Sequence, residues 1–444
     1  MALDNLSWQE VGKEVTVLRN SEEFRGSASN AAYNVMDYLA QPVLMVVFAP
    51  LLVRHLGFDH FGIWMLVTAL AGTFGMLQAG MGDATTKYVS AYRGQHDLPS
   101  VVRVIRGTLT LSALLGGLTA LALFLAAPVL VQHVFKIEPG DYRMAARAIQ
   151  IGASVLFLRS ISSVFSNTLR AHEAYGPSAR INVFVKVAII ASAVVLVLCG
   201  HGVVAMMYAT VGLTALGLIL LILAVRCLLP GASLWPTLET RTWREVFHFS
   251  FYSWVQSISA ATFSQADRLL VAALLGTSPL AYYTICVQLA QQVHGLPAAA
   301  FDFLFPHVSA KHQAGNRKGL KKVYRLAIAA NFLLSASLML PLVLFGRQIL
   351  SVWMGKSFAD HSYLLLSILA ISFFTLSLNV APYFTLLGLG KVRFVSLTTL
   401  FGGALSLAGT VALVPFLGLI GAATGRLFYG PIISLNYLKV EKSL

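Results

Sequence analysis

Long apolar stretches are the feature of this sequence that most restricts its fold. Each is about 20 residues or longer, which is enough for a helix to cross the roughly 30 Å hydrocarbon core of a membrane. Hydrophobic residues make up 57% of the chain and charged residues 11%, whereas about a quarter of the residues of a soluble domain are charged. The sequence therefore predicts an all-α integral membrane protein.

We predict twelve transmembrane helices, six in each half of the chain. The segment 1–27 before them is polar and is predicted to be a cytoplasmic interfacial helix. The predicted domains that follow are an N-terminal six-helix bundle at 28–228, a cytoplasmic linker at 229–245 and a C-terminal six-helix bundle at 246–444. The predicted spans are Ala28–Val53, Phe61–Gly82, Thr108–Gln132, Ala145–Asn167, Ile181–Gly200, Val203–Leu228, Val246–Leu275, Leu280–Phe305, Val323–Phe345, Tyr363–Leu389, Phe394–Phe416 and Leu419–Tyr437.

The two halves of the chain resemble each other in sequence. LLVRHLG in the first half matches LLVAALLG in the second, and a shift of 219 residues brings Leu70 onto Leu289 and Asp83 onto Asp302. Because an even number of spans gives both halves the same orientation, we predict a pseudo-twofold axis along the membrane normal. Internal repeats of this kind are typical of transporters.

The distribution of positive charge predicts the orientation in the membrane. With both termini in the cytoplasm, about 22 of the 32 Lys and Arg residues fall on the cytoplasmic side and about 6 on the opposite side. The net charge of +14 is therefore explained mostly by topology, and we expect no nucleic-acid partner. The connections between spans hold no nucleotide-binding loop, zinc spacing or nucleophile motif, so we expect no catalytic residue, cofactor or metal and no enzyme activity.

Basic side chains within the spans are candidates for a substrate site, because an ionisable group in hydrocarbon is costly unless it faces a cavity or a partner. Arg159, Arg268 and Arg426 are the predicted cationic residues of the cavity. For Arg268, snorkelling and neutralisation by Asp267 or another carboxylate remain alternatives. Lys186 lies near a helix end, so we expect it to snorkel and leave it out of the site. Helical spacing places Arg159 on one face in a stripe with Ser163, Asn167 and Arg170.

Other polar residues within the spans predict the wall of a central cavity between the halves, formed by spans one, two, seven and eight. The uncharged candidates for substrate binding are Asn34, Gln288, Gln291 and Gln292. The candidates for ion coupling or gating are Asp37, Asp83, Asp267, His294 and Asp302. The repeat superposes Asp83 on Asp302 at predicted helix ends, where helix capping or packing is the alternative to gating. For His294, the alternative to ion coupling is a packing role.

Several motifs carry a resemblance to a known family. LLVRHLGFDHFGIW, GMGDATTKYVSAY and FSQADRLLVAALLGTSPLAYYTICVQLAQ resemble the polysaccharide-biosynthesis branch of the MOP exporter superfamily, the Wzx-type flippases, which are related to MATE exporters. The resemblance covers essentially the whole chain. Its motifs include a glycine after the first span, a Gly-Asp step before a Tyr-Val-Ser run and an Asp-Arg pair late in span seven.

The resemblance implies both a fold and an activity. The fold is a MATE-like V of two six-helix bundles that works by alternating access. The activity is translocation of an undecaprenyl-diphosphate-linked oligosaccharide from the cytoplasmic to the outer leaflet of a bacterial inner membrane, for assembly of O-antigen, exopolysaccharide or capsule. The implied partners are this lipid-linked oligosaccharide, membrane lipids, and a polysaccharide polymerase and chain-length regulator.

A second function stays open from the sequence. The drug-exporting MATE branch shares the fold and often couples transport to a cation through an acidic residue in span one, where this chain has Asp37. An exporter of cationic drugs should concentrate carboxylates, however, whereas the deep arginines outnumber the deep acids here. Because arginine suits bidentate binding of phosphate, the charge balance favours the anionic lipid-linked substrate.

Overall fold

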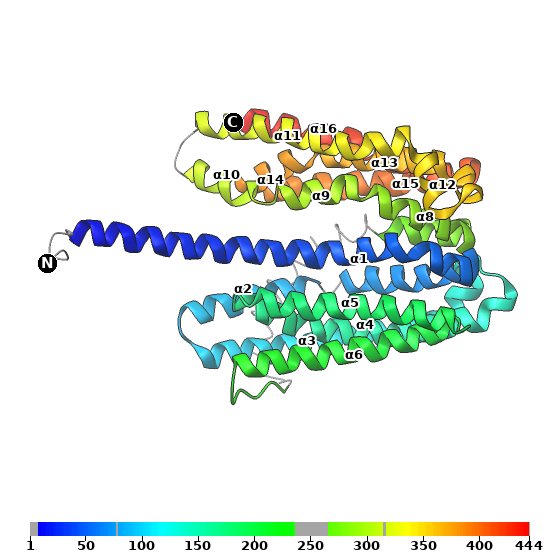
Figure 1. The fold of residues 1–444 in the computed structure, drawn as a ribbon, viewed down its shortest axis with the longest axis horizontal. Helices are drawn as coiled ribbons and strands as arrows, with labels where there is room; N and C mark the ends of the chain where they lie inside the picture. Colours follow the sequence, from blue (N-terminus) through cyan, green and yellow to red (C-terminus); the bar gives the residue numbers. More distant parts are fainter. Residues whose placement is uncertain (1–7, 77–78, 236–264, 314–316, 444) are drawn as a thin grey trace.

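The computed structural model describes residues 8–76, 79–235, 265–313 and 317–443, and these ranges are built of helices joined by short turns (Figure 1). A π-helical turn at Leu130–Val134 and a 3-10 turn at Pro139–Asp141 connect two helices of the first half. The helices of the first half are α1 (Trp8–Met76), α2 (Ala79–Gly94), α3 (Leu98–Val129), α4 (Tyr142–Ala171), α5 (Tyr175–Leu198) and α6 (Val203–Leu228).

The second half begins with helical residues 265–274. It continues through nine labelled helices, several of them short and separated by a single residue or a turn. They are α8 (Thr277–Ala290), α9 (Gln292–Ala300), α10 (Leu304–Gln313), α11 (Arg317–Leu344), α12 (Gly346–Met354), α13 (Lys356–Leu378), α14 (Val380–Gly388), α15 (Val392–Leu427) and α16 (Gly430–Ser443).

Glycines break the two longest helices. Gly57 has φ 78° within α1, and Gly418 has φ 56° within α15. Glycine adopts positive φ readily because it has no Cβ atom. Each of these helices therefore changes direction between two predicted spans. At the predicted domain boundary after residue 27, by contrast, α1 continues without a break.

Eight stretches of the described residues are long and apolar enough to cross a membrane. One of them, Leu39–Gly75, contains the break at Gly57, and another, Val392–Ser443, contains the break at Gly418. Most of predicted span seven lies outside the described residues, and predicted span eight is divided between α8 and α9. The structure thus confirms an all-helical, multi-pass membrane protein, while the count of twelve spans stays a prediction.

The helices extend beyond the predicted apolar spans. Predicted span two ends at Gly82, but α2 continues to Gly94, and α3 begins ten residues before predicted span three, at Leu98. Our apolar stretches therefore underestimate the helix lengths. A helix satisfies its own backbone hydrogen bonds and does not end where the apolar stretch ends, so polar helical ends project past the hydrocarbon.

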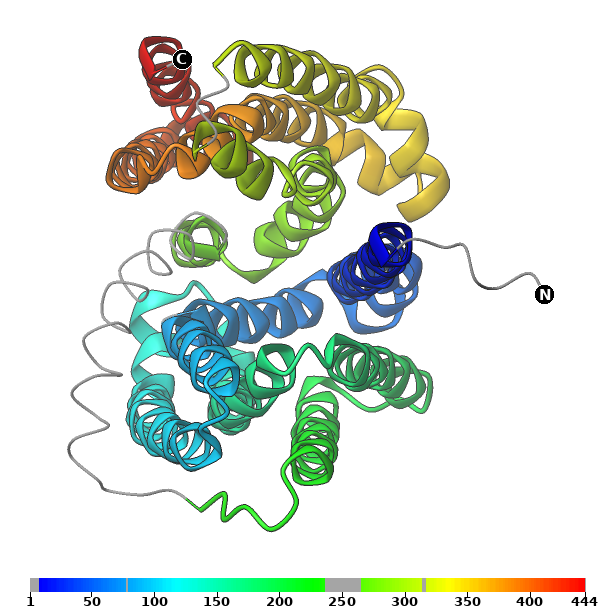
Figure 2. The same ribbon diagram turned by 90° about the vertical axis from the view of Figure 1, so that its left-hand side faces the viewer.

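The two halves of the chain form two groups of helices that lie side by side (Figure 2). The first described residues of α1 and the last of α16 lie at the same end of the molecule (Figure 1). Among the described residues, α1 and α8 make the main contact between the groups. The pairing of α1 with α8 therefore determines how the halves sit against each other.

The break in α1 lies at a tight contact between the halves, at the end of the molecule away from the termini (Figure 1). The rings of Phe58 and Tyr282 stack with centroids 4.3 Å apart, and the Thr277 hydroxyl donates to the Asp59 carboxylate at 3.4 Å. A Cβ atom at Gly62 would overlap the backbone carbonyl of Thr277. Glycine is thus required for this close approach of α1 to the start of α8.

Candidate functional site

The N-terminal half contains a polar cavity of about 350 Å³ between α1, α4, α5 and α6. Its charged lining residues are three bases, Arg159, Arg170 and Lys186, and one acid, Asp37. With three positive charges and one negative charge, the lining carries a net charge of +2. The remaining lining is rich in hydroxyl and amide groups, from Gln41, Ser162, Ser163, Ser166, Asn167, Asn182 and Thr214.

Asp37 forms ion pairs with two of these bases, Lys186 and Arg170. The Lys186 ammonium donates both to the Asp37 carboxylate and to the Asp37 backbone carbonyl, each at 2.6 Å. The Arg170 guanidinium approaches the other carboxylate oxygen at 3.4 Å. Our prediction that Lys186 snorkels and takes no part in the site was wrong, because α5 places Lys186 directly opposite the acid of α1.

Arg159, the third base of this cavity, forms no ion pair with Asp37. It is exposed and lies in the stripe with Ser163, Asn167 and Arg170, and all four residues line the cavity. The Asn167 amide donates to the carbonyl of Ser163 at 2.8 Å, as expected for neighbours one turn apart. The side chain of Asn34, predicted to lie on the same wall, falls outside the described residues.

A small cavity of about 90 Å³ lies between the halves. Arg159 and Gln41 line it from the first half, and Arg268 and Gln288 line it from the second. The Arg268 guanidinium donates to the side-chain oxygens of Gln265 (3.2 Å) and Gln291 (3.3 Å). Its Nε is buried and has no hydrogen-bond partner within the described part of the chain. This cavity therefore brings two predicted cationic residues from different halves to one space.

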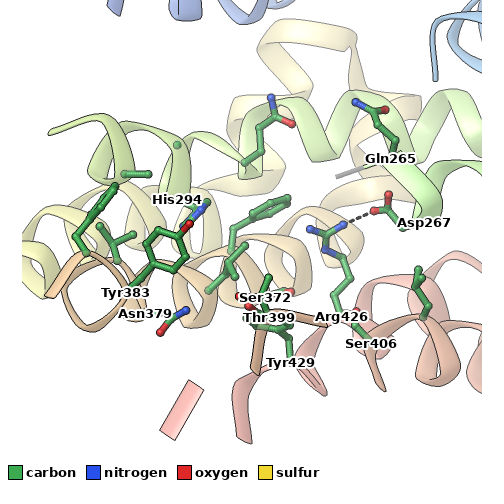
Figure 3. Close-up of a pocket in the computed structure, with 18 residues that line it drawn as sticks. Gln265, Asp267, His294, Ser372, Asn379, Tyr383, Thr399, Ser406, Arg426 and Tyr429 are labelled. Carbon is green, nitrogen blue, oxygen red and sulfur yellow. Dashed lines mark hydrogen bonds and ion pairs between the residues drawn. The ribbon is translucent and has the colours of Figure 1, made fainter. Parts of the chain in front are cut away.

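The C-terminal half contains a larger cavity of about 600 Å³ (Figure 3). Asp267 and Arg426 form an ion pair in its wall, with 3% and 10% of their side chains exposed. The Tyr283 hydroxyl donates to the same carboxylate at 2.7 Å, and the Arg426 guanidinium lies over the ring of Phe373, 4.4 Å from its centroid. The two lining charges cancel, so this cavity is neutral.

The ion pair shows which guanidinium the Asp267 carboxylate binds. The sequence left open whether Asp267 or another carboxylate neutralises Arg268. The Asp267 carboxylate pairs with Arg426 from α15, and its hydrogen bond with Arg268 is to the backbone N–H, 2.9 Å away. Adjacent residues of a helix point about 100° apart, so the two side chains turn to different neighbours.

Other predicted site residues lie near these cavities without joining the charged groups. Gln292 donates to the carbonyl of Gln288 at 3.2 Å. His294 lines the larger cavity, and its Nδ1 is buried with no partner among the described residues. Asp302 is exposed in the turn between α9 and α10, and the side chain of Asp83 lies outside the described residues. In the described ranges, no group of three or more metal-ligating side chains could hold an ion.

Among the described residues, the structure thus shows a cavity within each half and a small space between the halves. The predicted central cavity includes span seven, most of which lies outside the described residues, so that cavity stays a prediction. Sequence reasoning missed the roles of Lys186 and Arg170 toward Asp37. The signal that could have found them is an acid within the membrane, which requires a nearby base to offset its charge. Nothing in the sequence says which helix supplies that base.

Comparison with known proteins identifies the family. The profile of the family described as "Polysaccharide biosynthesis protein" matches residues 51–363, more than half of the chain. The chain belongs to this family. The resemblance of the sequence motifs to polysaccharide biosynthesis proteins is thereby confirmed.

Relatives of this polysaccharide biosynthesis protein are consistent with a transporter. A putative O-antigen transporter of Shigella flexneri is 21% identical over 89% of this chain and 92% of its own length. A probable low-salt glycan biosynthesis flippase of Haloferax volcanii is 22% identical over 83% and 74%. An inward-facing multidrug resistance MATE transporter shares the fold, with a TM-score of 0.76 at 15% identity over 92% of this chain and 94% of its own.

Proposed function

We propose that this polysaccharide biosynthesis protein is a flippase for an undecaprenyl-diphosphate-linked oligosaccharide. By alternating access, it moves the lipid from the cytoplasmic to the outer leaflet of the bacterial inner membrane. In the outer leaflet, a polymerase and a chain-length regulator use the lipid-linked oligosaccharide to assemble surface polysaccharide. In this proposal the chain has twelve spans in two six-helix bundles, and both termini are cytoplasmic. It catalyses no chemical reaction.

The observation that carries the proposal is the net charge of +2 in the N-terminal cavity. A lipid diphosphate is a multivalent anion, and two arginines and a lysine offer charge-assisted hydrogen bonds to its oxygens. The names of the O-antigen transporter and the glycan flippase support the same substrate class. Hydroxyl and amide groups around Arg159 would satisfy further phosphate oxygens.

The test is a deletion strain without a redundant flippase. We expect the lipid-linked repeat unit to accumulate in the cytoplasmic leaflet, surface polysaccharide to disappear, and the wild-type gene to restore both. The leaflet is read by access of a membrane-impermeant sugar-binding reagent in right-side-out and inverted vesicles. Normal outward display of the glycan in the deletion strain would overturn the proposal.

The effect of substituting Asp37 distinguishes a flippase from a cation-coupled multidrug exporter. In a flippase, Asp37→Asn should preserve or improve function, because the carboxylate competes with the diphosphate for Lys186 and Arg170. Its removal leaves three bases and no acid, and affinity for undecaprenyl diphosphate should rise by up to about tenfold. Binding of that lipid and complementation of the deletion strain are the measurements.

Lys186→Met removes the basic partner of the same ion pair and leaves the Asp37 carboxylate in place. It should weaken the binding of undecaprenyl diphosphate. In a drug exporter the pattern reverses: Asp37→Asn abolishes resistance to cationic drugs, and surface polysaccharide depends on neither residue. The proposal also keeps Asp83, which lies within α2, and Asp302, which lies in the turn between α9 and α10, as gating residues near the cytoplasmic face. Cysteine cross-links between them should then form in only one of the two transport states.

A further inference from the structure

The cavity of the C-terminal half differs in chemistry from that of the N-terminal half. The N-terminal cavity has a net charge of +2, whereas the C-terminal cavity has one acid and one base, which are paired to each other. The larger cavity therefore does not select an anion. An anion drawn to Arg426 would be repelled by Asp267, and a cation would meet the opposite balance.

The ion pair is shielded by protein groups. The Asp267 carboxylate accepts from Tyr283 as well as from Arg426, and the guanidinium of Arg426 is covered on one face by Phe373. Only 3% of the Asp267 side chain and 10% of the Arg426 side chain are exposed. A ligand in this cavity consequently meets mainly the uncharged lining groups.

Those groups suit a neutral ligand with many hydroxyls. Amide and hydroxyl side chains both donate and accept hydrogen bonds, as sugar hydroxyls do, and aromatic rings offer apolar faces for the C–H faces of a sugar ring. The cavity volume of about 600 Å³ is typical of small-molecule sites. The buried Nδ1 of His294 has no protein partner in the described part of the chain. The other groups of this kind are Gln265, Gln291, Ser372, Asn379, Tyr383, Thr399, Ser406 and Tyr429.

Apolar side chains also line this cavity, among them Phe373, Leu376, Val380, Phe384 and Leu407. They can pack against the C–H faces of a sugar ring, whereas a prenyl chain cannot contact them without also covering the polar groups. It would cover amide and hydroxyl groups without replacing the hydrogen bonds that water gives them, which costs free energy for each group. The chain has a better place in the surrounding lipid, where no polar group is desolvated. The mixture of polar and apolar lining groups thus matches the sugar part of a lipid-linked oligosaccharide, because a sugar ring has both hydroxyl groups and apolar C–H faces.

Two arginines lie between the N-terminal and C-terminal cavities. Arg159 lines both the N-terminal cavity and the small cavity between the halves. Arg268 lines the same small cavity and donates to Gln265 and Gln291, which line the C-terminal cavity. A diphosphate near Arg159 and sugars attached to it could therefore lie in adjoining spaces.

We propose that the C-terminal cavity binds the neutral sugar residues of the substrate while the N-terminal cavity holds its diphosphate. This inference rests on the proposed function, because it concerns the same lipid-linked oligosaccharide. It assigns glycan selectivity to the C-terminal half and affinity for the carrier lipid to the N-terminal half.

The experiment compares two probes in lipid nanodiscs, undecaprenyl diphosphate and the same lipid carrying the oligosaccharide extracted from the deletion strain. We expect the wild-type protein to bind the glycosylated lipid at least about tenfold more tightly, the gain from two ordinary hydrogen bonds. Ala298→Phe fills the cavity from α9. It should remove this gain and leave the binding of undecaprenyl diphosphate unchanged.

Ala300→Phe is the matched control, because Ala300 is exposed on the same helix. It should change neither affinity. Ser406→Leu fills the cavity from α15 and gives a second route to the same result if Ala298→Phe does not fold. Correct insertion is checked by thermal unfolding of each variant.

The outcomes separate this inference from the proposed function. If the wild type binds neither probe, both fail. If the wild type binds both probes equally, the carrier-lipid site is supported and the sugar site is wrong. The same holds if Ala298→Phe and Ser406→Leu both still bind the glycosylated lipid more tightly than undecaprenyl diphosphate. If Ala298→Phe weakens the binding of both probes to the same extent, the cavity binds the diphosphate or the prenyl chain instead of the sugars.

Discussion

Arg159→Ala is expected to weaken binding of undecaprenyl diphosphate by about 10- to 150-fold, which corresponds to loss of a charge-assisted hydrogen bond of about 1.5–3 kcal/mol. Arg159 lines the cationic cavity and is exposed within it. It makes no hydrogen bond or ion pair to other described side chains, so its removal should not unfold the protein. Surface polysaccharide should fall while the protein remains abundant in the membrane.

The matched control is Arg147→Ala, an exposed arginine of the same helix that does not line this cavity. It should leave lipid binding and surface polysaccharide unchanged. Arg159→Lys should restore function only partly, because a point charge keeps the attraction but loses the bidentate geometry. Equal effects of the two alanine substitutions would mean that general positive charge, and not this cavity, binds the lipid.

The position of Arg159 could be predicted because it depends on helical periodicity alone. Residues three and four apart share a helix face, and the stripe from Arg159 to Arg170 does line one cavity. The membrane fold was predictable for a similar reason, since the length of an apolar stretch determines whether it can span the bilayer. Both inferences need only local sequence.

The internal repeat also has a local structural counterpart. The 219-residue shift superposes Gly57 on Gly276, and both residues adopt positive φ, 78° and 104°. Each precedes the second helical segment of its half, so the chain turns in the same conformation at both places. Glycine at these two positions is explained by backbone geometry, because a residue with a Cβ atom rarely adopts positive φ.

The ion pairs could not be predicted, because they join distant segments. Asp37 meets Lys186 from α5, and Asp267 meets Arg426 from α15. Which helices are neighbours is decided by packing of the whole bundle, and periodicity gives the face of a helix without its partner. The expectation that Lys186 snorkels failed for this reason, and the pairing of Asp267 with Arg426 was not foreseen.

Asp267→Asn is expected to destabilise the protein by about 3–5 kcal/mol, the usual cost of leaving one partner of a buried ion pair without its counter-charge. Arg426 would keep its charge in a site where only 10% of its side chain is exposed. The amide oxygen can still accept from Tyr283, so the substitution removes charge with little change in shape. The apparent unfolding temperature in detergent should fall by several degrees.

Asp360→Asn supplies the control for this effect, because Asp360 forms a pair with Arg347 in which the side chains are 51% and 65% exposed. Water solvates an exposed charge after its partner is lost, so this variant should unfold close to the wild-type temperature. The double variant Asp267→Asn with Arg426→Met should recover most of the lost stability, since it leaves no unpaired charge in the wall. If the double variant is as unstable as Asp267→Asn alone, packing around the carboxylate, and not the uncompensated guanidinium, causes the loss.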